Sequence, residues 1–520
     1  MPEYYTNSNN EGFLDFGIRE QKNTILHNQN GFSAVFIKKE GLIMKVRTRF
    51  APSPTGFMHI GNLRTALYAY LFAKKHGGEF LLRIEDTDRE RYVEGAIGLI
   101  YRTLETAGII PDESPMNPGN CGPYVQSERK AIYAEYAHKL VELGGAYYCF
   151  CDKERLESLA DDKGVRKYDK HCLHLPKEEV ERRLKAGEPY VIRQNIPTEG
   201  TSAYDDMVFG RISVDCADLE DNILLKSDGM PTYNFANVVD DHLMGITHVI
   251  RGTEYLSSTP KYNLIYQSFG WEIPQYMHLP PIMKDAQRKL SKRYGDANFE
   301  DFIAKGYLPE AIVNYIALLG WSPKNNVEKM SLAELIENFS VEGLSKSASI
   351  FDEEKMRWLN GQYIRELPFE RFCALAKPFY EKSAVAGKYD YDKFSALLQN
   401  RVETLGEIPE KVAFLAEYSP DFSLTLYENK KNKTNAQTAK PILEASVKII
   451  EGLDSFNIDS LHESIGSYCE ANGIKKGAFL WCFRIALTAR EVTPGGAFEM
   501  ADILGKDECL SRLRSQLKRL

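Results

Sequence analysis

A strand, a turn and a helix follow one another near the N-terminus and constrain this 520-residue chain more than any other feature. Val46 to Phe50 is predicted as a short buried strand, and the Pro/Gly turn APSPTG occupies residues 51–56. An apolar-periodic helix is predicted from Leu63 to His76. Because the first N–H groups of a helix lack partners within it, this helix would direct its positive end at the turn. His59 and Gly61 lie at that point, which predicts a phosphate-binding site.

A second phosphate-binding segment, KLSKR, occupies residues 289–293. Its two lysines, Lys289 and Lys292, suit the negative charge that builds up on phosphates during a transfer. Triplets such as HIG arise by chance in many chains, so neither segment is specific alone. Together they predict two loops that close over one nucleotide.

Four extended segments carry a family resemblance: RFAPSPTGFMHIGNLRTA, LLRIEDTDRERYVEGA, SDGMPTYNFANVVDDHLMGITHVIRG and RKLSKRYGD. With them the chain resembles the class I aminoacyl-tRNA synthetases, and more narrowly the bacterial glutamyl-tRNA synthetases, from about Lys45 to its C-terminus. The resemblance implies ATP-dependent attachment of L-glutamate to tRNA(Glu) through a glutamyl-adenylate, with release of AMP and pyrophosphate. The implied partners are tRNA(Glu), L-glutamate and ATP, and a monomer is expected.

Composition is that of an ordinary globular protein, with 43% hydrophobic and 27% charged residues. No apolar stretch is long enough to span a membrane and no secretory signal is visible, so a cytoplasmic protein is expected. The net charge of −8 disfavours a protein that coats nucleic acid generally, but local basic patches could still bind one folded tRNA. The nine cysteines are expected to be reduced thiols or metal ligands.

The expected fold is an α/β doubly wound (Rossmann-like) catalytic domain with an α+β acceptor-binding insertion, followed by an all-α anticodon-binding region. The expected divisions are a disordered extension or misassigned start (1–43), the first catalytic half (44–127), the insertion (128–234), the second catalytic half (235–297), a helical stem-contact region (298–368) and a helical anticodon-binding domain (369–520). A functional role for the first segment stays open.

Further elements are predicted from periodicity and end signals. Strands are expected at Phe80–Ile84, Tyr190–Arg193 and Gly245–Gly252, and helices at Glu94–Ala107, Lys130–Leu143, Ala311–Leu319, Ser331–Asn338, Phe369–Lys377, Tyr391–Leu405, Pro441–Gly452 and Phe479–Thr488. Pro441 suits the first position of its helix, where no backbone hydrogen bond is lost.

Glutamate carries two carboxylates and an ammonium, so a selective pocket needs cations and an acid. Arginine suits carboxylates because its planar fork makes two parallel hydrogen bonds. The resemblance implies Arg49 and Arg251 as these cations, with Arg251 on the side-chain carboxylate and the Tyr233 hydroxyl beside it. A surface salt bridge is the competing reading of Arg251. Asn237 is implied near the backbone end of the amino acid.

Glu85, in the segment RIEDTD and helped by Ser53, is implied as the acceptor from the α-ammonium. Read alone, RIEDTD could be a solvated acidic turn. The chain departs from the family at Tyr255, where tryptophan is usual, and a flat amphipathic ring should preserve the pocket wall.

No covalent nucleophile is needed, because positioning and charge stabilisation carry the chemistry. His59, Lys289 and Lys292 are the implied catalytic residues. Magnesium should be held mainly by the phosphates. The ATP-binding set implied by the resemblance is His59, Gly61, Asn62, Glu254, Lys289, Ser291 and Lys292.

A cysteine and histidine cluster, C-x-C-x20-C-x-H, lies in the insertion. Cys149, Cys151, Cys172 and His174 supply three thiolates and one imidazole, which predicts a closed structural Zn²⁺ site. His171 is a competing ligand. Four unrelated side chains are the alternative.

Arg484, Thr493 and Pro494 lie where relatives contact the anticodon, although Arg484 could be an ordinary helix-surface charge. Three other functions compete: a glutaminyl-tRNA synthetase, a short paralogue that glutamylates a modified tRNA base, and a catalytically inactive tRNA-binding paralogue. A glutaminyl-tRNA synthetase would need no arginine at the side chain of its amino acid. The short paralogue lacks the helical C-terminal region. An inactive paralogue would have no reason to keep Lys289 and Lys292.

Overall fold

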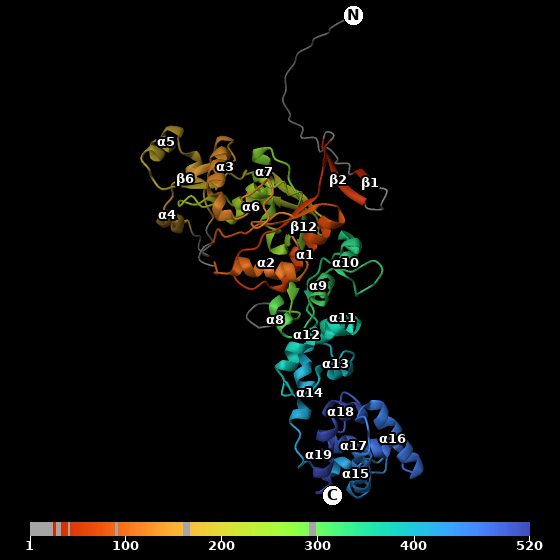
Figure 1. Cartoon of the computed structure of the whole chain (residues 1–520). Helices are drawn as coiled ribbons and strands as arrows, with labels where there is room; N and C mark the ends of the chain where they lie inside the picture. The colour runs from red at the N-terminus through yellow and green to blue at the C-terminus, as the bar shows by residue number, and fades with distance from the viewer. Residues whose placement is uncertain (1–23, 28–32, 40–41, 89–91, 160–166, 291–297) are drawn as a thin grey trace, which may run out of the picture.

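The computed structural model describes residues 24–27, 33–39, 42–88, 92–159, 167–290 and 298–520. Units that contain β-sheets occupy one end of an elongated molecule, and helices α12 to α19 form the other end (Figure 1). Among the described helices, none is both long and apolar enough to cross a membrane.

The catalytic sheet is built from two parts of the chain. In the first, β4 (Arg47–Phe50) and β5 (Glu79–Leu82) pair in parallel, and α1 (Ile60–Lys75) connects them. In the second, β11 (His248–Gly252) pairs in parallel with β12 (Gln275–Leu279). The two parts meet where the Thr247 N–H donates to the Arg47 carbonyl at 3.0 Å. This parallel arrangement confirms the doubly wound catalytic fold.

The insertion has its own antiparallel sheet and helices. Its elements are β6 (Ala146–Cys149), β7 (Val191–Gln194), β10 (Ile223–Leu225), α3 (Lys130–Glu142), α4 (Lys153–Ser158) and α5 (Lys177–Lys185). The hairpin of β8 (Thr201–Asp206) and β9 (Gly210–Asp215) does not join this sheet, because β8 pairs in parallel with β12. The chain therefore returns to the catalytic sheet within the predicted insertion.

Helix α6 (Tyr233–Leu243) connects the insertion to β11, and α7 (Thr259–Phe269) connects β11 to β12. The remaining early elements are α2 (Ala96–Thr106) and β13 (Ile282–Met283), which pairs with β14 (Ser349–Ile350). The described chain after residue 298 is otherwise helical, as expected: α8 (Phe299–Ala304), α9 (Pro309–Leu318), α10 (Leu332–Asn338), α11 (Glu353–Glu366), α12 (Phe369–Glu381), α13 (Tyr391–Leu398), α14 (Ile408–Ala416), α15 (Ala436–Glu451), α16 (Ile458–Ala471), α17 (Lys476–Thr488), α18 (Ala497–Leu504) and α19 (Lys506–Leu517).

Two large apolar cores hold these units together. The first packs the buried face of α1, including Leu63 and Leu67, against the catalytic sheet and α9. The second fills the C-terminal helices around residues such as Phe479 and Phe483. Burial of apolar area on this scale is the main stabilising contribution to each unit.

Two helix predictions were wrong at their ends. Pro441 lies inside α15 instead of at its first position, because Asn435 caps the helix and forms a capping box with Thr438 one turn earlier. The helix predicted from Tyr391 to Leu405 ends at Leu398.

Three short strands are described in the N-terminal segment. Within it, β1 (Thr24–His27), β2 (Ser33–Lys39) and β3 (Leu42–Met44) pair as antiparallel strands. Residues 1–23 lie outside the described chain.

Candidate active site

A cavity of about 660 Å³ opens where β4, β5 and β11 end. Open α/β sheets bind their ligands at this carboxyl edge, where parallel strands bring residues distant in sequence together. Ten predicted site residues line the cavity: Arg49, Ser53, His59, Gly61, Asn62, Glu85, Tyr233, Arg251, Glu254 and Lys289. Ser291 and Lys292 lie outside the described residues.

The N-terminus of α1 forms one wall of the cavity. His59 is its N-cap, and the Nδ1 atom of His59 accepts a hydrogen bond from the Gly61 N–H at 3.0 Å. A Cβ atom at Gly61 would lie 3.1 Å from that Nδ1 atom, which is a tight contact. The glycine therefore keeps the imidazole close to the helix end, where anions bind well.

Lys289 reaches the same cavity from the second catalytic part. Its backbone forms an antiparallel bridge with Met283, and its side chain is exposed. Lys289 and His59 thus share one cleft, as two loops that close over one nucleotide require.

Arg251 is the buried cation at the opposite end of the cavity. Its side chain is 5% exposed and lies over the rings of Tyr255, Tyr262 and Tyr276 at 5.1, 4.9 and 5.4 Å. Its Nη2 atom donates to the Thr259 hydroxyl at 2.5 Å. No carboxylate among the described residues forms an ion pair with it. The other reading of Arg251, a surface salt bridge, is excluded by this burial.

A network of buried charges lies beneath the amino-acid end of the cavity. Arg83 donates to Asp241 at 2.7 Å and to Glu85 at 3.0 Å, and Arg49 donates to Asp241 at 3.0 Å. Burial opposes ionisation of Asp241, but the two guanidinium groups outweigh it and hold its pKa below the usual value. Three cations here face three acids: Arg49, Arg83 and Arg129 against Glu85, Asp240 and Asp241. These three cations and three acids balance one another, whereas the hydrogen-bond partners of Arg251 are the neutral groups of His278 and Thr259.

Glu85 and the two tyrosines complete this end of the cavity. Burial raises the pKa of Glu85, although Arg83 and Arg49 act in the other direction. Tyr233 and Tyr255 lie ring against ring, with centroids 5.2 Å apart. Tyr255 lines the cavity, so the smaller ring still forms the wall expected of a tryptophan.

Asn237 is placed differently from the other predicted residues. It is buried on α6, and its amide donates to the Tyr233 carbonyl at 2.7 Å. It is not among the described residues that line the cavity. Sequence reasoning missed Arg64 and Thr65, which do line the cavity, and an arginine inside an apolar helix was the available signal.

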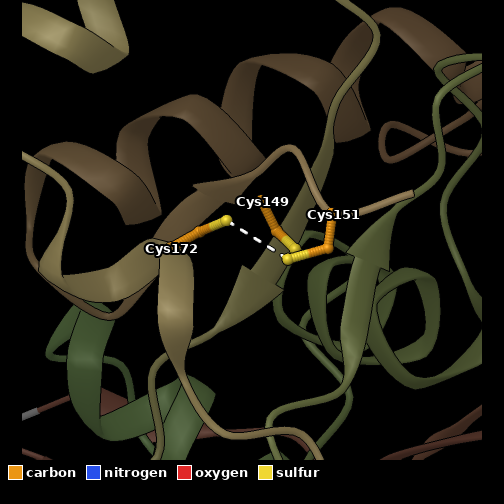
Figure 2. A group of neighbouring side chains, drawn as sticks. All are labelled: Cys149, Cys151 and Cys172. Atoms are coloured by element: carbon orange, nitrogen blue, oxygen red, sulfur yellow. Dashed lines mark hydrogen bonds between the residues drawn. The ribbon is translucent and has the colours of Figure 1, made fainter. Parts of the chain in front are cut away.

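The insertion brings three cysteines together, as Figure 2 shows. The Sγ atoms of Cys149, Cys151 and Cys172 lie within 4.8 Å of one another, and those of Cys151 and Cys172 are 3.5 Å apart. Hydrogen bonds from Cys172, Tyr168 and Arg193 lower the pKa of Cys149 and favour its thiolate. All nine cysteines are free thiols, as expected.

The structure differs from the prediction at the fourth ligand. His174 is exposed and does not belong to the cysteine group. The Tyr168 hydroxyl instead lies 3.3 Å from the Cys149 Sγ atom and 3.4 Å from that of Cys151. Ligand atoms around tetrahedral zinc are spaced by roughly 3.5–3.8 Å, so three sulfurs and this oxygen fit the metal. Sequence spacing alone could not identify Tyr168 as a ligand. Lys170, between Tyr168 and Cys172, has a positive φ of 57°, and the Tyr168 hydroxyl accepts a hydrogen bond from the Cys172 N–H.

Thr493 and Pro494 line a cavity of about 670 Å³ within the C-terminal helical region, together with Arg401, Lys411 and Arg490. Arg484 does not line it and packs over the Trp481 ring at 5.4 Å. The structure therefore brings only two of the three predicted anticodon residues together.

Comparisons with known proteins agree with this geometry. The family model "tRNA synthetases class I (E and Q), catalytic domain" matches residues 45–358, and the model "Anticodon binding domain" matches residues 371–517. A "Glutamate--tRNA ligase" of Clostridium tetani is 55% identical over 92% of this chain and 98% of its own length. One from Clostridium acetobutylicum is 54% identical, with 92% and 99% coverage.

Solved structures show the same architecture. A glutamate tRNA ligase from Elizabethkingia meningosepticum, in complex with its amino acid, superposes with a TM-score of 0.83 at 36% identity, covering 92% of this chain and 100% of that one. The enzyme from Elizabethkingia anophelis gives a TM-score of 0.82 at 35% identity, with 91% and 100% coverage. The chain therefore belongs to the class I tRNA synthetases and, within them, to the glutamate–tRNA ligases.

Proposed function

We propose that this protein attaches L-glutamate to tRNA(Glu), with Arg251 as the receptor for the side-chain carboxylate. The observation that carries the proposal is that, among the described residues, no carboxylate forms a direct ion pair with the buried Arg251. A buried charge without a partner is costly, and a substrate carboxylate in the cavity would supply the missing counter-charge. Glutamine, which has no side-chain charge, would leave it uncompensated.

The charge pattern also orients the amino acid. Glu85 would accept the α-ammonium, whose positive charge would favour ionisation of a carboxyl group that burial disfavours. Tyr233 would donate its hydroxyl to the side-chain carboxylate, and Ser53 would support the ammonium. Arg49 would contribute a second, weaker attraction, because Asp241 already balances it. Asn237 would act through the Tyr233 backbone, to which its amide is bonded.

In the first step, the α-carboxylate of glutamate attacks the α-phosphorus of ATP, the bond to the β-phosphate oxygen breaks, and pyrophosphate leaves. His59 and the positive end of α1 would hold the phosphates. Lys289 would stabilise the developing charge from within the cavity, and Ser291 and Lys292 would assist it. Glu254 would lie near the adenosine. Magnesium bound to the phosphates would neutralise part of their charge.

In the second step, the 2′-hydroxyl of the terminal adenosine of tRNA attacks the activated carbonyl, and AMP leaves. Zinc held by Cys149, Cys151, Cys172 and Tyr168 would stabilise the insertion that binds the acceptor stem. Thr493 and Pro494, with the basic residues of their cavity, would contact the anticodon. Arg484 would act from a neighbouring helix.

A charging assay tests the proposal. The purified protein is incubated with ATP and with glutamate or glutamine, on purified tRNA(Glu) and tRNA(Gln) separately. We expect esterification of glutamate on tRNA(Glu), lost in Lys292→Ala and reduced in Arg251→Ala. Glutamine esterification would contradict the assignment of Arg251, and absence of any charging would favour an inactive tRNA-binding paralogue.

A further inference from the structure

A fully buried histidine, which does not line the cavity, contacts Arg251. His278 on β12 is the register partner of Arg251 on β11, and its Nε2 atom lies 3.2 Å from the Arg251 Nε atom. The arginine Nε atom always carries a hydrogen, so the histidine must present a lone pair there. The proton of a neutral His278 ring therefore resides on Nδ1.

Asp206 fixes that arrangement. Its Oδ2 atom lies 2.6 Å from the His278 Nδ1 atom and also accepts from the His278 backbone N–H. Its Oδ1 atom accepts from the backbone N–H groups of Val208 and Phe209, each at 2.9 Å. Four hydrogen bonds hold the carboxylate in place, and it sets both the ring orientation and the tautomer of the histidine.

The environment of His278 favours the neutral ring. Burial lowers its pKa and the charge of Arg251 lowers it further, while Asp206 and the more distant Glu254 act in the opposite direction. Thr259 on α7 also faces the Nε2 atom, at 3.3 Å, and its hydroxyl is 2.8 Å from the Tyr255 carbonyl. The rings of Tyr204 and Tyr276 cover the remaining sides.

A neutral acceptor has a specific consequence for Arg251. A carboxylate in direct contact would orient the guanidinium equally well, but it would also neutralise its charge, as Asp241 does for Arg49. The imidazole orients the guanidinium without neutralising it. Arg251 has five N–H donors, and the bonds to His278 and Thr259 use two, so three remain for a ligand.

We propose that Asp206 and His278 are positioning residues that aim Arg251 into the cavity and leave its charge available, and so determine the preference for glutamate over glutamine. The inference rests on the proposed function, because it assigns a cause to the selectivity of the same pocket. Neither residue lines the cavity, so neither would touch the substrate.

The sharpest test uses substitutions that change the hydrogen-bonding atoms of Asp206 and His278. In Asp206→Asn, an amide NH₂ group toward Nδ1 would favour the other tautomer, which places an N–H against the Arg251 Nε–H. His278→Phe keeps a ring but removes both nitrogens, and His278→Gln offers an oxygen near the Nε2 position. We expect Asp206→Asn and His278→Phe to raise the KM for glutamate roughly tenfold to hundredfold, because hydrogen bonds to a buried charge are lost. His278→Gln should recover part of this loss.

Other kinetic constants separate positioning from general damage. The KM for ATP and the kcat at saturating glutamate should change less than about twofold, and the ratio of kcat/KM for glutamate over glutamine should fall. His248→Phe and His248→Gln are matched controls, because His248 is equally buried at the opposite end of β11 and bonds to Thr247. They should leave the KM for glutamate unchanged.

The proposal is overturned if His278→Phe keeps the wild-type KM for glutamate, or if the His248 variants raise it equally. Should Asp206→Asn fail to fold, the comparison of His278→Phe with His278→Gln still decides. Wild-type protein that fails to charge tRNA(Glu) would instead refute the proposed function. Normal wild-type charging with unaffected variants would refute only the positioning role.

Discussion

The two ends of the catalytic sheet each hold an arginine, half-buried Arg47 and buried Arg251, and give it opposite kinds of partner. At the amino end, Arg47 forms ion pairs with Glu79 and Glu113. At the carboxyl end, Arg251 has neutral partners and aromatic rings. A balanced arginine stabilises the fold, whereas an arginine left unbalanced creates a site for an anion. Arg83 is fully buried and yet paired with Asp241, so counter-charge distinguishes a structural arginine from a receptor better than burial does.

Exchanging each arginine for methionine should separate the two roles. We expect Arg251→Met to lower kcat/KM for glutamate on the order of 10³-fold, because the substrate carboxylate then enters the pocket without a cation. Arg47→Met should leave the KM for glutamate nearly unchanged and lower the unfolding temperature more than Arg251→Met does. Steady-state charging and thermal unfolding of both variants measure these effects, and a larger stability loss in Arg251→Met would contradict the comparison.

On the phosphate side of the cavity the cation is an exposed lysine, Lys289, and not a buried arginine. We expect Lys289→Ala to lower kcat roughly 10²-fold at saturating glutamate, since it removes charge stabilisation in the transfer step. The unfolding temperature should not change. Lys284→Ala is a matched control, because Lys284 is exposed on the same segment and does not line the cavity. A kcat loss of similar size in Lys284→Ala would show that general charge, not position, matters.

The cysteine cluster extends the comparison of charge balance to a site where a metal ion would be surrounded by protein ligands. We expect Tyr168→Phe to weaken zinc binding roughly tenfold to hundredfold, while His174→Ala retains one zinc per chain. Competition with a chelator and metal analysis of the purified variants measure this directly. Loss of zinc in His174→Ala with normal binding in Tyr168→Phe would restore the histidine as the fourth ligand.

Sequence reasoning succeeded where a signal is local. The helix after the Pro/Gly turn follows from periodicity, and α1 begins at Ile60, three residues before the predicted start. It failed at α15, where Pro441 outweighed the local capping signal of Asn435.

The missed parts of the site depend on pairing between distant segments. His278 meets Arg251 through the register of β11 and β12, and Asp206 joins them because β8 returns to the catalytic sheet. Neither contact leaves a pattern in the linear chain. The motifs could therefore indicate Arg251 as a candidate cation for the substrate, but not His278 and Asp206, which orient it.

The smallest expected effect concerns Glu113, which balances Arg47 at the amino end of the sheet. Its carboxylate accepts from Arg47 at 3.1 and 3.2 Å and from the Tyr124 hydroxyl at 2.5 Å. Burial alone would raise the pKa of Glu113, but the hydrogen bonds from Arg47, Cys121 and Tyr124 outweigh it and lower the pKa to about 2. Glu113→Gln should therefore cost about 1–3 kcal/mol of unfolding free energy at pH 7.

The lowered pKa of Glu113 determines how its contribution to stability changes with pH. A carboxyl group with a folded pKa below its unfolded value of 4.5 stabilises the protein above that pH, and the contribution disappears as the pH falls toward 2. The difference between wild type and Glu113→Gln should therefore shrink between pH 5 and 2, as measured by denaturant unfolding. Glu105→Gln, an exposed carboxylate on α2, should change stability by less than about 0.5 kcal/mol at any pH. A gap for Glu113 that stays constant with pH would mean that shape, and not charge balance, holds this end of the sheet together.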